Sequence, residues 1–136
     1  MSRRRKAREI ALQTLYAAEV SGNEWRAVLR ENVSRRKASG EVVEYAERLV
    51  SDVTEQRSDL DARISKRLEN WELRRVSVVD QTILRIALAE LINCPEIPTS
   101  VIMNEAIEIA QKFSTADAGR FVNGVLDALA KEVRPA

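Results

Sequence analysis

The first eight residues of the chain, MSRRRKAR, carry positive side chains at high density and no acidic one. The cations are Arg3, Arg4, Arg5, Lys6 and Arg8. Guanidinium and ammonium groups bind phosphate oxygens through charge-assisted hydrogen bonds, so a cluster of them attracts polyanions. The rest of the chain holds 17 basic and 21 acidic residues, which leaves the formal net charge at +1. The pattern predicts a local polyanion-binding surface on a slightly acidic body.

The cationic cluster continues without a break into an apolar repeat of helical spacing, over residues 7–20. The apolar stripe contains Ala7, Ala11, Leu15 and Ala18. When this stripe is continued backward at 100° per residue, Arg4 and Arg8 fall on it. Because burying an unpaired charge is costly, we expect the first two turns to project beyond the core. The alternative is a solvated terminus without a binding role.

Residues suited to catalysis or metal binding are scarce. The chain has no histidine and a single cysteine, Cys94, and it contains no glycine-rich phosphate loop. Glu105 with Glu108, and Glu44 with Glu47, are carboxylate pairs at i, i+3 spacing, which we expect on solvated outer helix faces. Exposed carboxylates of this kind have no raised pKa to make them catalytic acids. We therefore expect a binding function, with no enzymatic activity, no metal and no cofactor.

The composition indicates one all-α domain. The chain has 136 residues, of which 45% are hydrophobic and 32% are charged. Four glycines, three prolines and 4% aromatic residues favour helices over strands. A lone cysteine indicates a reducing compartment, and no apolar run approaches the ~20 residues of a membrane span, so we expect a cytoplasmic protein. A basic helix lying on a membrane surface is the weaker alternative.

Hydrophobic spacing predicts about seven helices and no strand. We expect them to form two packed bundles within one domain, about 1–69 and 76–136, with Trp71 and Leu73 as apolar anchors at the junction. The segment SRRKASG, residues 34–40, is a second basic cluster, for which a solvated connector is the preferred interpretation. The predicted helices span 7–20, 24–33, two parts of 41–69 divided near 57–59, 76–93, 101–113 and a last segment after 114–117.

Two local patterns mark the last helix. Ser114 and Asp117 have the spacing of a capping box, in which each side chain accepts from the backbone near the other. Gly119 and Gly124 each cost about 1 kcal/mol relative to alanine inside a helix. This cost suggests that another backbone or a ligand passes close by, and tight helix packing is the preferred interpretation for Gly124.

The last third of the chain resembles a known family. Residues 80–131 are similar to the C-terminal half of the NusB family, above all in ILRIALAEL, NEAIEIAQKF and FVNGVLD. The start RRRKAREIALQTLYAAE, residues 3–19, resembles the arginine-rich first helix of that family. NWELRRVSVVDQ, residues 70–81, is similar to the family's mid-chain junction. The resemblance spans the chain, and residues 21–69 contribute little to it.

The resemblance to NusB implies a fold and a function. The fold would be all-helical, with two small bundles packed against each other and the first helix presenting its arginines to RNA. The function would be transcription antitermination. In this family NusB pairs with NusE, a ribosomal protein of the small subunit, and the pair binds the boxA element of nascent ribosomal RNA. The antitermination complex so formed helps RNA polymerase to read through terminators.

The resemblance also implies roles for individual residues. The positions that match RNA contacts are Arg3, Arg4, Arg5, Lys6, Arg8, Tyr16 and Phe121. The positions at or near the NusE surface are Asp80, Arg85 and Asp117, of which Asp117 also matches an acid that tempers RNA affinity. The chain departs from many relatives at Gln81, where they have Arg, and at Ser114, where they have Gly. These departures fall on the partner contacts and on the local helix cap.

Three functions are compatible with these patterns. The first is the RNA-binding antitermination factor, for which four or five phosphate contacts predict a salt dependence of log K near −3. The second is a helical protein-interaction module, with the basic tip used for solubility or for a homodimer that masks the RNA surface. The third is the helical domain of a ribosomal-RNA cytosine methyltransferase. It is disfavoured because no cofactor-binding domain follows in this sequence. Monomer and homodimer both stay open.

Overall fold

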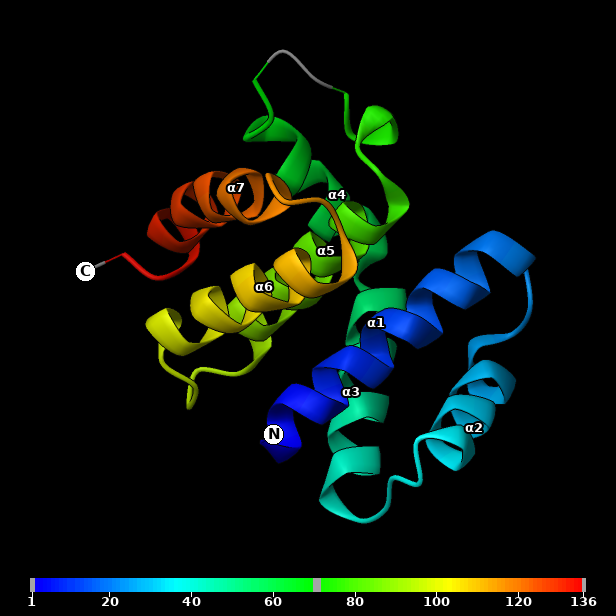
Figure 1. Ribbon diagram of the computed structural model, residues 1–136. Coiled ribbons are helices and arrows are strands. Elements are labelled where there is room, and N and C mark those ends of the chain that lie inside the picture. Colours follow the sequence, from blue (N-terminus) through cyan, green and yellow to red (C-terminus); the bar gives the residue numbers. More distant parts are fainter. Residues whose placement is uncertain (1, 70–71, 136) are drawn as a thin grey trace.

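The computed structural model describes residues 2–69 and 72–135, and within these ranges the chain is all-helical (Figure 1). The elements are α1 (Arg3–Ser21), α2 (Trp25–Arg35), α3 (Glu41–Glu55), α4 (Arg57–Lys66), a short 3-10 helix η1 (Leu73–Arg75), α5 (Val78–Asn93), α6 (Thr99–Phe113) and α7 (Ala118–Val133). The prediction of an all-α fold with about seven helices is confirmed. Trp71, expected as a junction anchor, lies outside the described residues. None of the described helices is both long and apolar enough to cross a membrane.

The helices associate in two groups that α1 joins (Figure 1). Helix α1 packs against α2 and α3 on one side, while α5, α6 and α7 pack against one another. Helix α1 also contacts α5, and α4 lies against α3, α5 and α7. One large core cluster therefore draws on both groups. The boundary between two bundles near residues 69–76 stays a prediction.

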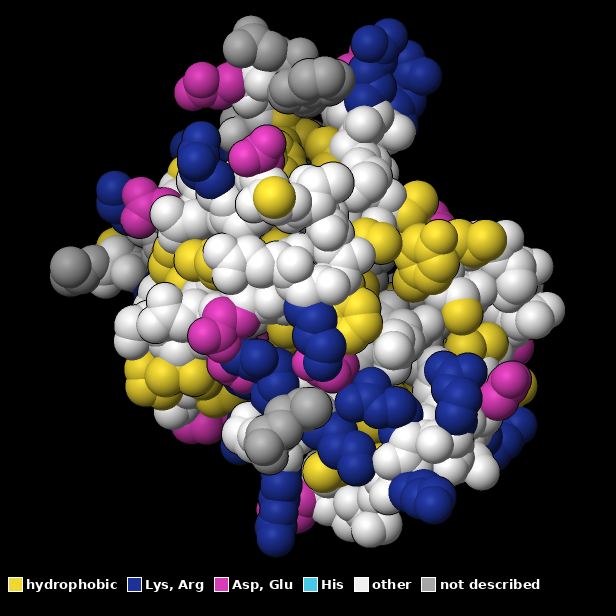
Figure 2. All heavy atoms as spheres, in the orientation of Figure 1, with side chains coloured by type: hydrophobic (Ala, Val, Ile, Leu, Met, Phe, Trp, Pro, Cys, Tyr) yellow, Lys and Arg dark blue, Asp and Glu magenta, His cyan; other side chains and the backbone are white. Residues whose placement is uncertain are grey.

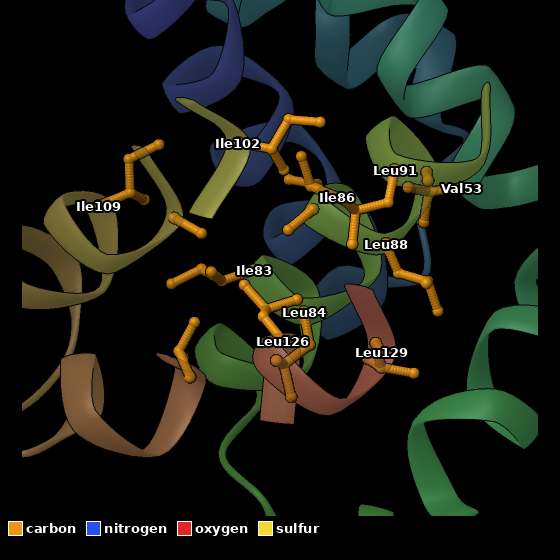
Figure 3. Packing of buried hydrophobic residues seen from close by; sticks show 14 of the residues in the cluster. Val53, Ile83, Leu84, Ile86, Leu88, Leu91, Ile102, Ile109, Leu126 and Leu129 are labelled. Carbon is orange, nitrogen blue, oxygen red and sulfur yellow. The ribbon is translucent and has the colours of Figure 1, made fainter. Parts of the chain in front are cut away.

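Helix α5 is the centre of the core. Every residue from Gln81 to Leu91 is buried, as expected for a helix that is apolar nearly all round. Figure 3 shows its side chains among those of α3, α6 and α7. The labelled members are Val53, Ile83, Leu84, Ile86, Leu88, Leu91, Ile102, Ile109, Leu126 and Leu129. Truncating one of these leucines to alanine typically costs about 2–5 kcal/mol, so this packing holds the helices that carry the surface groups.

Helix α1 begins four residues before the apolar repeat does. The side chain of Ser2 accepts a hydrogen bond from the backbone N–H of Arg5 at 3.0 Å and caps the helix. The arginine cluster is therefore helical from its first member. Helical backbone fixes the direction in which each of its side chains leaves the helix.

Two expectations about the last helices are wrong. Ser114 ends α6, and the side chain of Asp117 makes no capping hydrogen bond at the start of α7. A turn between the two helices takes the place of the capping box, with the N–H of Ala118 donating to the Thr115 carbonyl at 3.1 Å. Gly124 is exposed, and a methyl group added to it would meet no described atom within 4 Å, so tight packing does not explain it. Gly119 is the closely packed glycine, since a methyl group there would lie 3.1 Å from Cγ of Gln111 on α6.

Candidate nucleic-acid interface

The five cations of the first two turns of α1 leave the helix in different directions, because successive side chains rotate by about 100°. Arg5 and Arg8 point toward α5 and α6, where they meet carboxylates. Arg3, Arg4 and Lys6 lie on the other sides of the helix. Lys and Arg side chains gather in the lower part of Figure 2, where α1 begins beside α2 and α3 in Figure 1.

Arg8 is buried, with a side chain only 3% exposed. Its Nε lies 2.8 Å from Oε1 of Glu90 on α5, and its Nη2 lies 2.8 Å from Oε2 of the same carboxylate. Tyr45 on α3 donates its hydroxyl to that carboxylate at 2.5 Å. Burial alone lowers the pKa of Arg8, but the hydrogen bonds and charge of Glu90 outweigh it and raise the pKa above its usual value. The expectation that the first two turns project beyond the core is wrong for Arg8, because Glu90 supplies the missing partner.

Arg5 is tied to α6. Its Nε and Nη2 donate to the two carboxylate oxygens of Glu105 at 2.8 and 2.5 Å, and Nη2 also contacts Glu108. The hydrogen bond from Arg5 lowers the pKa of Glu105 despite the partial burial of that carboxyl. Arg8 adds a further contact to Glu105 at 3.2 Å. The expectation of solvated outer faces is therefore wrong for Glu105, which links α6 to the arginine cluster.

The outward cations are held more loosely. Arg3 pairs with Glu41 at 3.1 Å, and both side chains are more than three-quarters exposed. The guanidinium of Arg4 lies 4.4 Å above the ring centre of Tyr45, a cation–π contact that leaves its N–H groups available. Lys6 is half-buried and has no acidic group within 4.0 Å in the described part of the chain. These three side chains can bind phosphate without breaking a buried interaction.

Glu9 is a structural residue of the cluster whose role was not predicted from the sequence. Its side chain is 1% exposed, and it accepts hydrogen bonds from Lys112 of α6 at 3.0 Å and from Arg36 at 3.2 Å. Helices α1 and α6 and the end of α2 thus meet at one carboxylate. An acidic residue beside Ile10 on an otherwise apolar helix face is the signal that could have indicated it.

The two aromatic positions, Tyr16 and Phe121, differ in exposure. Tyr16 is 40% exposed on α1, about 18 Å along the helix axis from Arg4 at 1.5 Å per residue. Phe121 is half-buried on the first turn of α7, where it packs against the core. Tyr16 can offer its ring to a nucleobase, whereas most of the Phe121 ring is used in packing.

The expected partner positions differ in accessibility. Arg85 is buried, with its Nε 2.7 Å from Asp61 Oδ1 and its Nη2 3.0 Å from Gln81 Oε1, and its place at or near the NusE surface stays a prediction. Asp117 is exposed before α7. Asp80 is half-buried on α5, and its Oδ1 is buried with no hydrogen-bond partner among the described residues. Asp117 is therefore fully accessible for a partner, and Asp80 only in part.

Gln81, which departs from many relatives, has a structural role. Its amide Nε2 donates to the carbonyls of Leu73 and Val76, both at 2.8 Å, and its Oε1 accepts from Arg85. The side chain therefore holds η1 on the start of α5. The departure at Gln81 therefore bears on the junction between η1 and α5.

The chain matches the sequence model of the NusB family over residues 5–131. It is 40% identical to the transcription antitermination protein NusB of Geotalea uraniireducens, over 96% of this chain and 95% of that one. It is 38% identical to the NusB of Leptospira biflexa, over 99% and 97% of the two chains. The NusB of Chloroherpeton thalassium is 37% identical, and the chain spans 63% of that protein's length.

Solved structures agree with these matches. The T. maritima NusB structure superposes with a TM-score of 0.89 at 38% identity, over 95% of this chain and 91% of that one. A structure of the antitermination factors NusB and NusE in complex with dsRNA contains a chain with a TM-score of 0.89 at 28% identity. It covers 97% of this chain and 98% of that one. Both sequence and fold match over nearly the whole length, and the chain therefore belongs to the NusB family.

Proposed function

We propose that this chain is a transcription antitermination protein that binds RNA together with NusE. The observation that carries the proposal is the outward set of cations, Arg3, Arg4 and Lys6, on the arginine-rich helix of a NusB fold. A relative of the same fold is solved with NusE and dsRNA. The expected ligand is single-stranded boxA RNA, and the expected assembly is the antitermination complex of RNA polymerase. We expect the protein to act in the cytoplasm, because its proposed function is in transcription.

In this proposal, RNA affinity and RNA sequence selectivity come from different residues. Phosphate contacts from Arg3, Arg4 and Lys6 supply affinity but carry no sequence information. Selectivity for boxA therefore has to come from base contacts, for which exposed Tyr16 is the better placed aromatic residue, or from NusE. Asp80 and Asp117 are the candidate contacts to that partner, of which Asp117 is exposed and Asp80 is half-buried. The proposed role is binding, with no catalytic step.

The buried ion pairs change the expected salt dependence. Arg8 is enclosed and Arg5 is held by two carboxylates, so fewer phosphates are contacted than the sequence suggests. At about 0.7 per contact in single-stranded RNA, the three outward cations give a log–log slope of about −2.

The test measures binding of fluorescent boxA RNA and of a scrambled RNA, with and without NusE, over a series of salt concentrations. We expect a preference for boxA that increases with NusE and affinity that falls with salt. Arg4→Gln is expected to weaken binding, and Arg74→Gln, an exposed arginine on η1, is the matched control. Binding that ignores RNA sequence, NusE and salt contradicts the proposal. In that case sedimentation is expected to reveal the alternative, a homodimer.

A further inference from the structure

A surface hollow lies between the start of α1 and the connection from α2 to α3. It has a volume of about 430 Å³ and is lined by cations from both segments, Arg3 and Lys6 of α1 and Lys37 of the connection. The hydroxyl-bearing Ser39 and the acid Glu41 complete its polar lining. The first basic cluster and the loop 34–40 therefore share one cavity, although 31 positions separate Lys6 from Lys37 in the sequence.

The charge in this hollow is unbalanced. Glu41 is bound to Arg3 at 3.1 Å, which leaves Lys6 and Lys37 without an acidic group within 4.0 Å in the described part of the chain. Two ammonium groups at one cavity repel each other, and an anion between them removes the repulsion and gains two charge-assisted hydrogen bonds. The hollow is thus suited to a phosphate group.

The connection between α2 and α3 has a defined, hydrogen-bonded structure. Its interpretation as a solvated connector is therefore insufficient. Arg36 turns inward and donates to Gln13 at 2.9 Å and to the buried Glu9 at 3.2 Å. The N–H of Lys37 donates to the Ser34 carbonyl at 3.1 Å, and the N–H of Ala38 donates to the Val33 carbonyl at 3.0 Å. These bonds fix the backbone of Lys37, at φ 52°, and leave its side chain exposed at the hollow.

The hollow continues into the outward face of the arginine cluster. Arg3 lines this cavity and also a neighbouring one, whose lining includes Arg4, Arg48 and Tyr45 together with the acids Glu41 and Glu44. The cations therefore follow one track, from Lys37 through Lys6 and Arg3 to Arg4. A track of this kind matches a strand with repeated phosphates better than a single small anion. A membrane surface fits less well, because the exposed large hydrophobic side chains of the described residues, Tyr16, Val20 and Val101, do not line the hollow.

We propose that Lys6 and Lys37 form a phosphate subsite that extends the RNA surface of α1 to the connection between α2 and α3. The ligand is a backbone phosphodiester of the bound RNA strand. This inference rests on the proposed function, since it adds a contact to the same RNA. It increases the number of phosphate contacts from three to about four. The expected log–log slope of the salt dependence becomes steeper, from about −2 to about −3.

The test compares Lys37→Gln, Lys6→Gln and the double variant with Lys66→Gln, which removes an exposed lysine at the end of α4, at the opposite end of the molecule from the start of α1 (Figure 1). The measurement is the salt dependence of binding to boxA RNA. We expect Lys37→Gln to make the slope shallower by about 0.7 and to weaken binding about fivefold at 0.1 M salt. Lys66→Gln is expected to match the unchanged protein, and Lys37→Arg is expected to restore the slope.

The outcomes separate the two proposals. If the unchanged protein shows no salt-dependent RNA binding, the proposed function fails and this subsite fails with it. If the unchanged protein binds RNA and Lys37→Gln keeps its slope and affinity, the subsite alone is overturned. A second experiment measures binding of the same variants to phosphatidylglycerol vesicles. Vesicle binding that Lys37→Gln abolishes, with RNA binding unaltered, overturns the RNA assignment in favour of a lipid surface. Thermal unfolding of each variant checks that the fold is retained.

Discussion

Arg8 and Glu90 form a buried ion pair, 2.8 Å between Nη2 and Oε2, that joins the arginine-rich start of α1 to the central helix α5. Both side chains are at most 3% exposed. A cluster that the sequence presents as one basic surface is therefore divided in two. Arg5 and Arg8 hold α1 against α5 and α6, while Arg3, Arg4 and Lys6 remain outside. The first group is expected to determine stability and the second to determine RNA affinity.

Arg8→Ala tests the structural group. Removing one member of a buried pair leaves Glu90 as an uncompensated charge, which typically costs about 3–5 kcal/mol of unfolding free energy. Urea unfolding measures this loss. Arg74→Ala, which removes an exposed pair with Glu72, is the control and is expected to cost about 1 kcal/mol or less. Equal effects of the two substitutions would show that the Arg8 pair is not buried in solution.

Arg4→Gln and Arg5→Gln are expected to have different effects, although both residues belong to the same motif. Arg4 lies over the Tyr45 ring and has no ion pair within the described residues, so its loss is expected to lower RNA affinity several-fold and to change the unfolding free energy by less than about 1 kcal/mol. Arg5 donates to Glu105 and Glu108, so its loss is expected to reduce stability by about 1–2 kcal/mol. Fluorescence anisotropy with RNA and urea unfolding of both variants measure the difference. Loss of RNA affinity without loss of stability for Arg5→Gln contradicts the division.

The positions of the helices could be predicted from the sequence because they depend on periodic patterns. The apolar run of α5 indicated a helix enclosed by others, and it is buried from Gln81 to Leu91. The break between α3 and α4, at Gln56, lies within a residue of the expected division. Cap chemistry was less predictable, since the spacing of Ser114 and Asp117 says nothing about the turn that separates α6 from α7.

Pairings across the fold could not be predicted in the same way. Glu90 and Glu105 are separated from Arg8 by 82 and 97 positions, and no local pattern places them beside it. The rule that unpaired charge stays out of a core was correct, but the partner was not visible in the sequence. The burial of Arg85 depends on a partner of the same kind, Asp61 on α4, which lies 24 positions away in the sequence. Long-range ion pairs therefore decided which members of the basic motif are exposed.

Glu108→Gln is expected to strengthen RNA binding. The Glu108 carboxylate contacts Arg5 and is 58% exposed, so it competes with phosphate for that guanidinium at little cost to the fold. Neutralising it releases one donor, and we expect a gain of a few-fold in affinity with a steeper salt slope. Glu69→Gln, an exposed acid after α4, is the matched control. No difference between the two variants in RNA titrations would mean that Arg5 stays with Glu105 and adds no phosphate contact when Glu108 is neutralised.

The Glu105 ion pair predicts how stability depends on acid. The hydrogen bond from Arg5 lowers the pKa of Glu105 in the folded state below its ordinary value of 4.5. At pH values between the folded-state and the unfolded-state pKa of Glu105, the unfolded chain binds a proton that the folded chain does not bind. The stabilisation by the ion pair is therefore complete near neutral pH and is lost as the pH falls through this range. Glu105→Gln removes this dependence. Urea unfolding from pH 7 to pH 3 should therefore show the unchanged protein more stable than Glu105→Gln at pH 7, with the difference shrinking below about pH 4.5. A difference that stays constant over this range would mean that the Glu105 carboxylate has the same pKa in the folded and unfolded states, and that its contact with Arg5 is not maintained in solution.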